Sequence, residues 1–112
     1  MKYQATGLAA WSVQRAGAVY MLFFVLFVLL ALSLRPLHSY AEWRAWVAHP
    51  GVTLGLLGFF TALLSHMWVG LRDVLLDYVR AAGLRRLLLG VLGFFLLGIA
   101  AWVLWILVRI QS

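Results

Sequence analysis

The sequence is 112 residues long, 66% hydrophobic and only 11% charged, which excludes an ordinary soluble protein and indicates a single integral membrane domain. Its net charge of +6 comes from basic residues scattered between apolar runs, so a nucleic-acid-binding surface is not indicated either. The lack of cysteine excludes disulfides, thiolate metal sites and cysteine nucleophiles.

The first transmembrane helix is predicted over about residues 16–35. Residues 17–34 carry no charge, and eighteen such residues are enough to cross the hydrocarbon core. A cleaved signal peptide is disfavoured because the apolar run is too long and Arg35-Pro36 follows it in place of a small-residue cleavage site. The residues before this span are polar enough to lie at a membrane surface.

A short amphipathic helix is predicted to lie in the interface within the loop at residues 35–50. Its apolar side chains recur at helical spacing and are expected opposite its charged ones, namely Tyr40, Trp43, Trp46 and Val47 opposite Glu42 and Arg44. His38 and His49 are interpreted as solvent-exposed residues, because neither is accompanied by another ligand at metal-binding spacing. Pro50-Gly51 marks a break before the next helix.

Two further spans are predicted over about residues 51–80 and 86–109, which makes the fold an all-α membrane domain of three transmembrane helices. Gly83, between the two spans, is expected to end the second helix. Small residues recur in both spans and are expected to let another helix approach closely: Gly51, Gly55, Gly58 and Ala62 in one, and Gly90, Gly93 and Gly98 in the other.

The distribution of basic residues predicts the orientation. Six of them fall on the side that holds the N-terminus and the second loop, against three on the side of the first loop and the C-terminus. The positive-inside rule therefore places the N-terminus in the cytoplasm and the C-terminus outside.

The residues that could carry chemistry follow the middle of the second span. At about 100° per residue, His66, Gly70, Asp73 and Asp77 fall along one stripe that runs toward the cytoplasmic end. An ionisable residue within a span suggests function. His66 could ligate haem iron, relay protons or hydrogen-bond a neighbouring helix.

A haem with two histidine ligands would require a partner, because this chain supplies only one histidine within a span. Arg15, at the inner end of the first span, could pair with a haem propionate or simply anchor the helix. Asp77 and Tyr78 could bind and protonate a quinone, or could be an acid and an aromatic at a solvated helix end. No nucleotide-binding, metalloprotease or serine-hydrolase motif occurs, so a self-contained enzyme is not indicated.

The pattern His66-x-Trp68-x-Gly70, followed by Asp77-Tyr78 eleven and twelve residues after the histidine, resembles the second transmembrane helix of the hydrophobic membrane anchors of succinate dehydrogenase, the D-type subunits. The Arg15-Ala16 pair just before the first span is also similar to that family. So are three helices in 112 residues with the N-terminus inside.

The resemblance implies a non-catalytic subunit of respiratory complex II. Such anchors pair with a C-type cytochrome b subunit, hold haem b between the two, and dock an iron–sulfur subunit and a flavoprotein subunit on the cytoplasmic side. There ubiquinone is reduced with electrons from succinate, a step of the tricarboxylic acid cycle. His66 would be an axial ligand of the haem iron, Tyr78 a quinone hydrogen-bond donor with Asp77 beside it, and Arg15 would face the haem propionates or the quinone pocket.

Two alternatives remain at this stage: an anchor of fumarate reductase, and a cofactor-free membrane scaffold or assembly subunit. A short N-terminus without an Arg/Ser-rich transit segment favours the bacterial inner membrane over an imported mitochondrial location.

Overall fold

The structure, a computed structural model, describes the backbone of residues 2–111 and the side chains of residues 7–111. The described chain forms four helices and no strand: α1 (Lys2–Leu34), α2 (Tyr40–Ala48), α3 (Pro50–Tyr78) and α4 (Ala82–Gln111). By length and composition, α1, α3 and α4 can each cross a membrane. The predicted all-α fold, with three such helices and a short helix in the first loop, is confirmed.

The helices differ from the prediction mainly at their ends. α1 begins at Lys2, well before the uncharged run, because residues 2–15 contain no proline and only one glycine to interrupt it. The expectation that Gly83 ends the second helix is wrong, since Gly83 lies in the first turn of α4. α3 ends instead at Tyr78, and Val79 takes an extended conformation (φ −94°, ψ 109°) that turns the chain without a left-handed residue.

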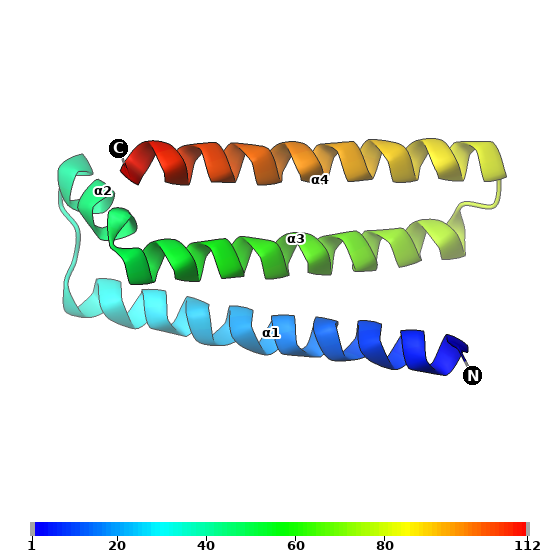
Figure 1. Cartoon of the computed structure of the whole chain (residues 1–112), viewed down its shortest axis with the longest axis horizontal. Coiled ribbons are helices and arrows are strands. Elements are labelled where there is room, and N and C mark those ends of the chain that lie inside the picture. The colour runs from blue at the N-terminus through cyan, green and yellow to red at the C-terminus, as the bar shows by residue number, and fades with distance from the viewer. Residues whose placement is uncertain (1, 112) are drawn as a thin grey trace.

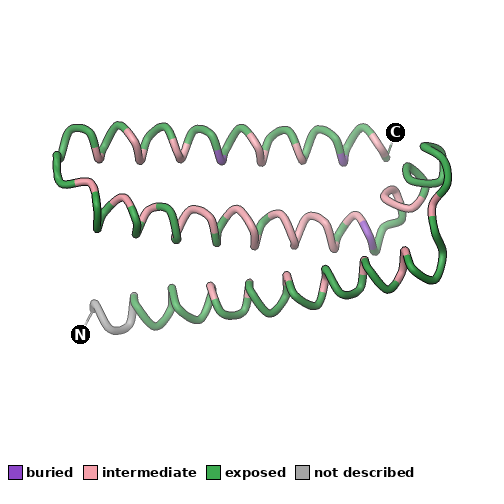
Figure 2. The backbone as a smooth tube through the Cα atoms, turned by 180° about the vertical axis from the view of Figure 1, so that it is seen from behind, coloured by how far each residue is buried: buried purple, intermediate pink, exposed green. Residues whose placement is uncertain are grey.

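The three long helices are arranged with α3 in the middle (Figure 1). α1 packs along one side of α3 and α4 along another, and the described parts of α1 and α4 do not contact each other. Little of the chain is therefore enclosed: among the described side chains only Val52, Leu96 and Leu107 are buried (Figure 2). A large apolar surface is left for lipid or for another protein.

A narrow seam joins α1 to α3. Half-buried residues of α1 recur every three or four positions, at Gln14, Gly17, Met21, Phe24, Val28 and Ala31, and Leu32 beside the last of them is also half-buried. Phe24 stacks on Phe59 with 5.2 Å between ring centroids, and the hydroxyl of Tyr20 donates to the carbonyl of Gly55 at 2.7 Å. A Cβ atom on Gly55 would lie 2.6 Å from the Phe24 ring, so the expectation that small residues of α3 admit another helix is confirmed here.

We call the end of the molecule that carries α2 the α2 end, and the opposite end the Tyr78 end. α2 begins with two side-chain caps that resemble a capping box: the Ser39 hydroxyl accepts from the Glu42 N–H, and the Glu42 carboxylate accepts from the N–H of His38, the residue before the N-cap. At the next helix start His49 is more than a solvated side chain, because its Nδ1 accepts from the Gly51 N–H and caps α3.

Side-chain hydrogen bonds hold α2, α3 and α4 together at the α2 end. Thr53 Oγ1 donates to the Val47 carbonyl at 2.6 Å, and Gln111 Nε2 donates to Thr53 Oγ1 at 2.9 Å. The expectation that Tyr40 lies opposite Arg44 is wrong: residues four apart share a helix face, and both line one groove against α4.

Candidate functional site

The predicted stripe on α3 is exposed along its whole length. All four of its residues are exposed at the surface of the chain: His66, Gly70, Asp73 and Asp77. Apart from the adjoining residues and backbone of α3 itself, no atom of the described chain lies within 4 Å of the position that a Cβ on Gly70 would occupy. Because Gly70 lies one helical turn from His66 and has no side chain, a flat group or another helix has room to approach the imidazole on this face.

The same face of α3 is covered by α1 nearer the α2 end. Gly55 meets Phe24, and Ala62 lies 3.6 Å from the Cβ position of Gly17. Beyond that point the two helices diverge toward the N-terminus of α1 (Figure 1). His66 lies one turn past Ala62 and is exposed, so the described part of this chain does not supply the neighbouring helix to which His66 could hydrogen-bond.

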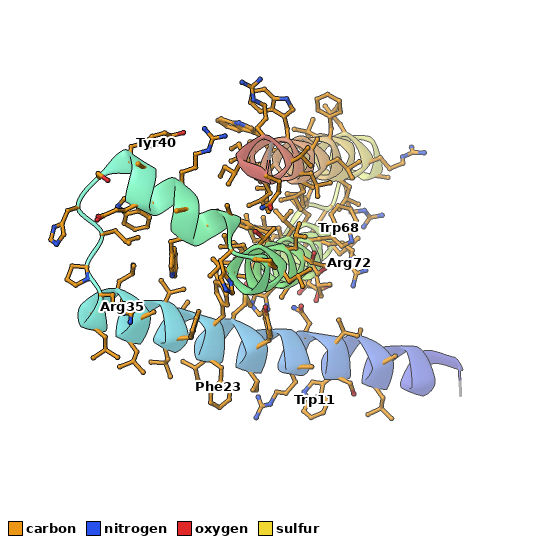
Figure 3. All side chains as sticks on the ribbon, turned by 60° about the vertical axis from the view of Figure 1, so that its left-hand side comes forward. Trp11, Phe23, Arg35, Tyr40, Trp68 and Arg72 are labelled. Carbon is orange, nitrogen blue, oxygen red and sulfur yellow. The ribbon has the colours of Figure 1, made fainter. Side chains whose placement is uncertain are left out.

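Arg15 is not brought to His66. Its guanidinium lies 5.7 Å from the centroid of the Trp11 ring on the same helix, and its side chain is exposed. Trp11 lies on the side of α1 that faces away from α3 (Figure 3). Arg15 could meet a cofactor held with His66 only through a different side-chain conformation.

Asp77 and Tyr78 are the last two residues of α3, and both are exposed; Tyr78 is 79% accessible. At about 1.5 Å per residue they lie roughly 17 Å along the helix from His66. Neither side chain makes a hydrogen bond or ion pair with the described residues. Both polar groups are thus available to a molecule or protein that approaches the Tyr78 end.

Arg72 and Asp73 form an ion pair between neighbouring residues of α3, with 3.2 Å between Nη2 and Oδ1. The pair is partly exposed, and a pair of this kind contributes about 0–1 kcal/mol to stability. It neutralises Asp73, so that Asp77 is the carboxylate of the stripe without an ion-pair partner among the described residues. The Nε atom of Arg72 is buried without a hydrogen-bond partner in the same region.

A groove of about 540 Å³ lies between α3 and α4, directly beside the stripe. Ser65, the residue before His66, lines it together with Trp68, Gly93 and Ala100. Trp68 packs against Gly93, with 3.7 Å between the indole ring and the Cβ position of the glycine. The sequence does not predict this groove, although Trp68 belongs to the pattern around His66 and Gly93 to the small residues of the third span.

The described side chains contain no group of three or more histidines, cysteines or carboxylates that could hold a metal ion. His66 is thus a single possible metal ligand on the surface of the described chain. An imidazole in that position can serve as one ligand of a group held between two proteins.

Comparisons with known proteins identify the family of the chain. Residues 1–101 match the family described as "Succinate dehydrogenase/Fumarate reductase transmembrane subunit". The chain is 29% identical over 103 residues to the succinate dehydrogenase hydrophobic membrane anchor subunit of Coxiella burnetii, an alignment that covers 89% of this chain and 90% of that protein. No solved structure matches the chain.

Proposed function

Because the chain belongs to the family of succinate dehydrogenase/fumarate reductase transmembrane subunits, we propose that it is the hydrophobic membrane anchor of a bacterial succinate:ubiquinone oxidoreductase. It is a multi-pass membrane protein, and in this proposal its place is the bacterial inner membrane. The chain itself is non-catalytic: it holds the catalytic subunits at the membrane and contributes side chains to the sites that electrons reach.

The observation that carries the proposal is the exposed face of α3. It presents His66 within the span and Asp77 and Tyr78 at the helix end, and no described part of the chain covers any of them. A cofactor-free scaffold would not require an uncovered histidine in that place, since the exposed imidazole contributes little to the packing within the chain.

The residues fit haem b. His66 offers one exposed imidazole, and Gly70 leaves the helix surface beside it open. In the proposal His66 would be one ligand of the haem iron, and a histidine of a C-type cytochrome b subunit would be the second. Haem, when bound there, supplies one-electron transfer. Arg15 would turn from Trp11 toward the propionates, a pairing that guanidinium groups favour.

Ubiquinone is proposed to bind at the Tyr78 end. The Tyr78 hydroxyl can donate a hydrogen bond to a quinone carbonyl, and the Asp77 carboxylate can hold that hydroxyl or pass a proton as the quinone is reduced. The positive-inside rule makes this end cytoplasmic, where an iron–sulfur subunit and a flavoprotein subunit would dock. Electrons from succinate would then enter at the end where Asp77 and Tyr78 lie.

The test of haem ligation is His66→Gln in the complex purified with its partner anchor. Glutamine keeps a polar side chain but offers no imidazole, so we expect the b-type Soret band and the reduced-minus-oxidised difference spectrum to be lost. His38→Gln is the matched control, because His38 is exposed outside the spans and its backbone, not its ring, makes the described hydrogen bond. Its spectrum should equal that of the wild type.

An unchanged spectrum in His66→Gln would show that the haem does not depend on His66 and would overturn its assignment as a ligand. Absence of a b-type band from the wild-type complex would favour the cofactor-free scaffold. The family also contains fumarate reductase anchors. The physiological direction is read from the same complex by comparing succinate:ubiquinone turnover with quinol:fumarate turnover, and the proposal requires the former to dominate.

A further inference from the structure

A second groove lies at the α2 end, far from the proposed redox residues. Its volume is about 530 Å³, and it is lined by Tyr40 and Arg44 of α2 and by Trp105, Ile106, Arg109 and Ile110 of α4. Figure 3 shows Tyr40 on the edge of α2 and extending in the direction of α4. The lining combines two guanidinium groups, two amphipathic aromatic rings and two aliphatic side chains, and it contains no acidic residue.

We propose that this groove binds the phosphate of an anionic phospholipid, with an acyl chain along the apolar side of α4. The two arginines are 65 residues apart in sequence, and the fold alone brings them together. A phosphodiester carries one negative charge and several acceptor oxygens, which match the planar donors of a guanidinium. A guanidinium has five N–H donors, so a bond to a carbonyl is compatible with another to a phosphate.

The geometry orders both cations in advance. Arg44 Nη2 donates to the Arg109 carbonyl at 3.4 Å, which links α2 to the last turn of α4. The Arg109 guanidinium lies 5.0 Å from the centroid of the Trp105 ring and can stack on it. Side chains held in this way lose less entropy when they bind an anion than freely rotating ones.

The position of the groove is that of a lipid headgroup. α4 carries no charge between Leu87 and Val108, so Arg109 follows directly after a run long enough to cross the hydrocarbon core. Trp102 and Trp105 are exposed near the same end, as is usual at the headgroup layer. Ile106 and Ile110 add apolar surface to the groove, and Ile106 lies on the membrane side of Arg109, where an acyl chain would run.

The distribution of charge also sets these arginines apart. Only three basic residues, Arg35, Arg44 and Arg109, lie on the side of the first loop and the C-terminus, where the positive-inside rule disfavours them. Two of those three line the same groove. Glu42, the acid of α2, accepts from the His38 N–H at the start of the helix and does not line the groove.

The test is a lipid titration of the purified full chain, followed by native mass spectrometry from detergent micelles. Phosphatidylglycerol, phosphatidylcholine with the same acyl chains, and inorganic phosphate are compared. We expect phosphatidylglycerol to bind most tightly, and Arg44→Gln/Arg109→Gln to weaken it at least about tenfold, the factor that one lost charge-assisted bond already implies.

The matched control is Arg35→Gln/Arg80→Gln, which removes the same charge from exposed positions outside the groove. It should change binding less than about twofold, because exposed and distant charges are screened. Far-UV circular dichroism checks that both variants fold. If the Gln double variant does not fold, Arg44→Lys/Arg109→Lys replaces it: the charge is kept while the planar donors are lost, and weaker binding is expected.

Several outcomes would overturn the proposal. Equal losses in the groove variant and the control would mean general attraction between a basic protein and an anionic lipid. Equal binding of phosphatidylcholine would mean that the charge is not recognised. Displacement of the lipid by millimolar inorganic phosphate would mean a site for free phosphate and not for a lipid.

Discussion

At the scale of single residues, hydrogen-bond partners separate the side chains that fold the molecule from those that are available for function. Tyr20 and Tyr78 carry the same hydroxyl, but Tyr20 donates to the Gly55 carbonyl between two helices, whereas Tyr78 is 79% accessible at the end of α3. The histidines divide in the same way, since His49 accepts a hydrogen bond that caps α3, whereas His66 makes no hydrogen bond with the described residues and lies beside the open Gly70.

The proposed quinone site is tested by Tyr78→Phe, which removes only the hydroxyl. Substitution at an exposed position should change the free energy of unfolding by no more than about 0.5 kcal/mol. If the hydroxyl donates to the quinone, succinate:ubiquinone turnover by the complex should fall about tenfold, as expected for the loss of one hydrogen bond that matters in the transition state.

Succinate oxidation by an artificial dye is the internal control for that variant, because the dye takes electrons before they reach the membrane anchor. It should remain at the wild-type rate, and so should the haem spectrum. Equal loss of both activities would place the effect of Tyr78 in assembly and not in quinone binding.

At the scale of helices, the spans could be predicted from sequence and their pairing could not. Long uncharged runs must form helices in a membrane because the backbone has no other way to satisfy its hydrogen bonds. Ends were less predictable: α1 continues through its polar first residues, and the chain leaves α3 at Val79 without a glycine. Nothing in the local pattern separates a glycine that ends a helix from one that begins the next.

The candidate site shows the same division. Residue type and spacing predicted the stripe from His66 to Asp77, because helical periodicity alone places those residues on one face. Periodicity does not predict that α1 diverges from that face, or that Arg44 meets α4. Both depend on how helices distant in sequence pack against one another. The ion pair between Arg72 and Asp73 joins two neighbouring residues of α3, and it assigns them no role in the quinone site.

Gly55→Ala tests the seam between α1 and α3. The added Cβ would lie 2.6 Å from the Phe24 ring, and that ring cannot move freely because it stacks on Phe59. We expect the free energy of unfolding of the chain in micelles to fall by about 1–3 kcal/mol, the usual cost of overpacking.

Gly70→Ala is the matched control for the seam, since it makes the same change on the same helix where no described atom lies within 4 Å. It should leave stability unchanged or raise it by up to about 1 kcal/mol through better helix propensity. Circular dichroism during unfolding by denaturant measures both variants. Similar stability of the two would contradict the close approach of α1 to Gly55.

At the scale of the whole molecule, the two ends differ in how firmly the helices are joined. The α2 end holds α2, α3 and α4 through Thr53, Gln111 and Arg44. Toward the Tyr78 end α1 separates from α3, and α1 and α4 do not meet within the described chain. One end is thus built by this chain alone, while the end with the proposed redox residues presents open helix faces to a partner.

This asymmetry makes a further distinction testable with Gly70→Leu. A leucine at an exposed, open position should leave the helical content and unfolding of the isolated chain within about 0.5 kcal/mol of wild type. If the partner anchor and the haem approach α3 along the face of His66, the same leucine should block them, because a packed interface tolerates no additional side chain of that size. We therefore expect co-purification of the C-type subunit and the b-type absorbance to fall together.

Leu54→Ile is the control, because it changes the shape of an exposed side chain on the same helix without adding volume, and it should affect neither. Normal assembly in Gly70→Leu would show that the partner approaches another face, and the groove between α3 and α4 beside Ser65 would then be the face to examine by the same substitution at Gly93.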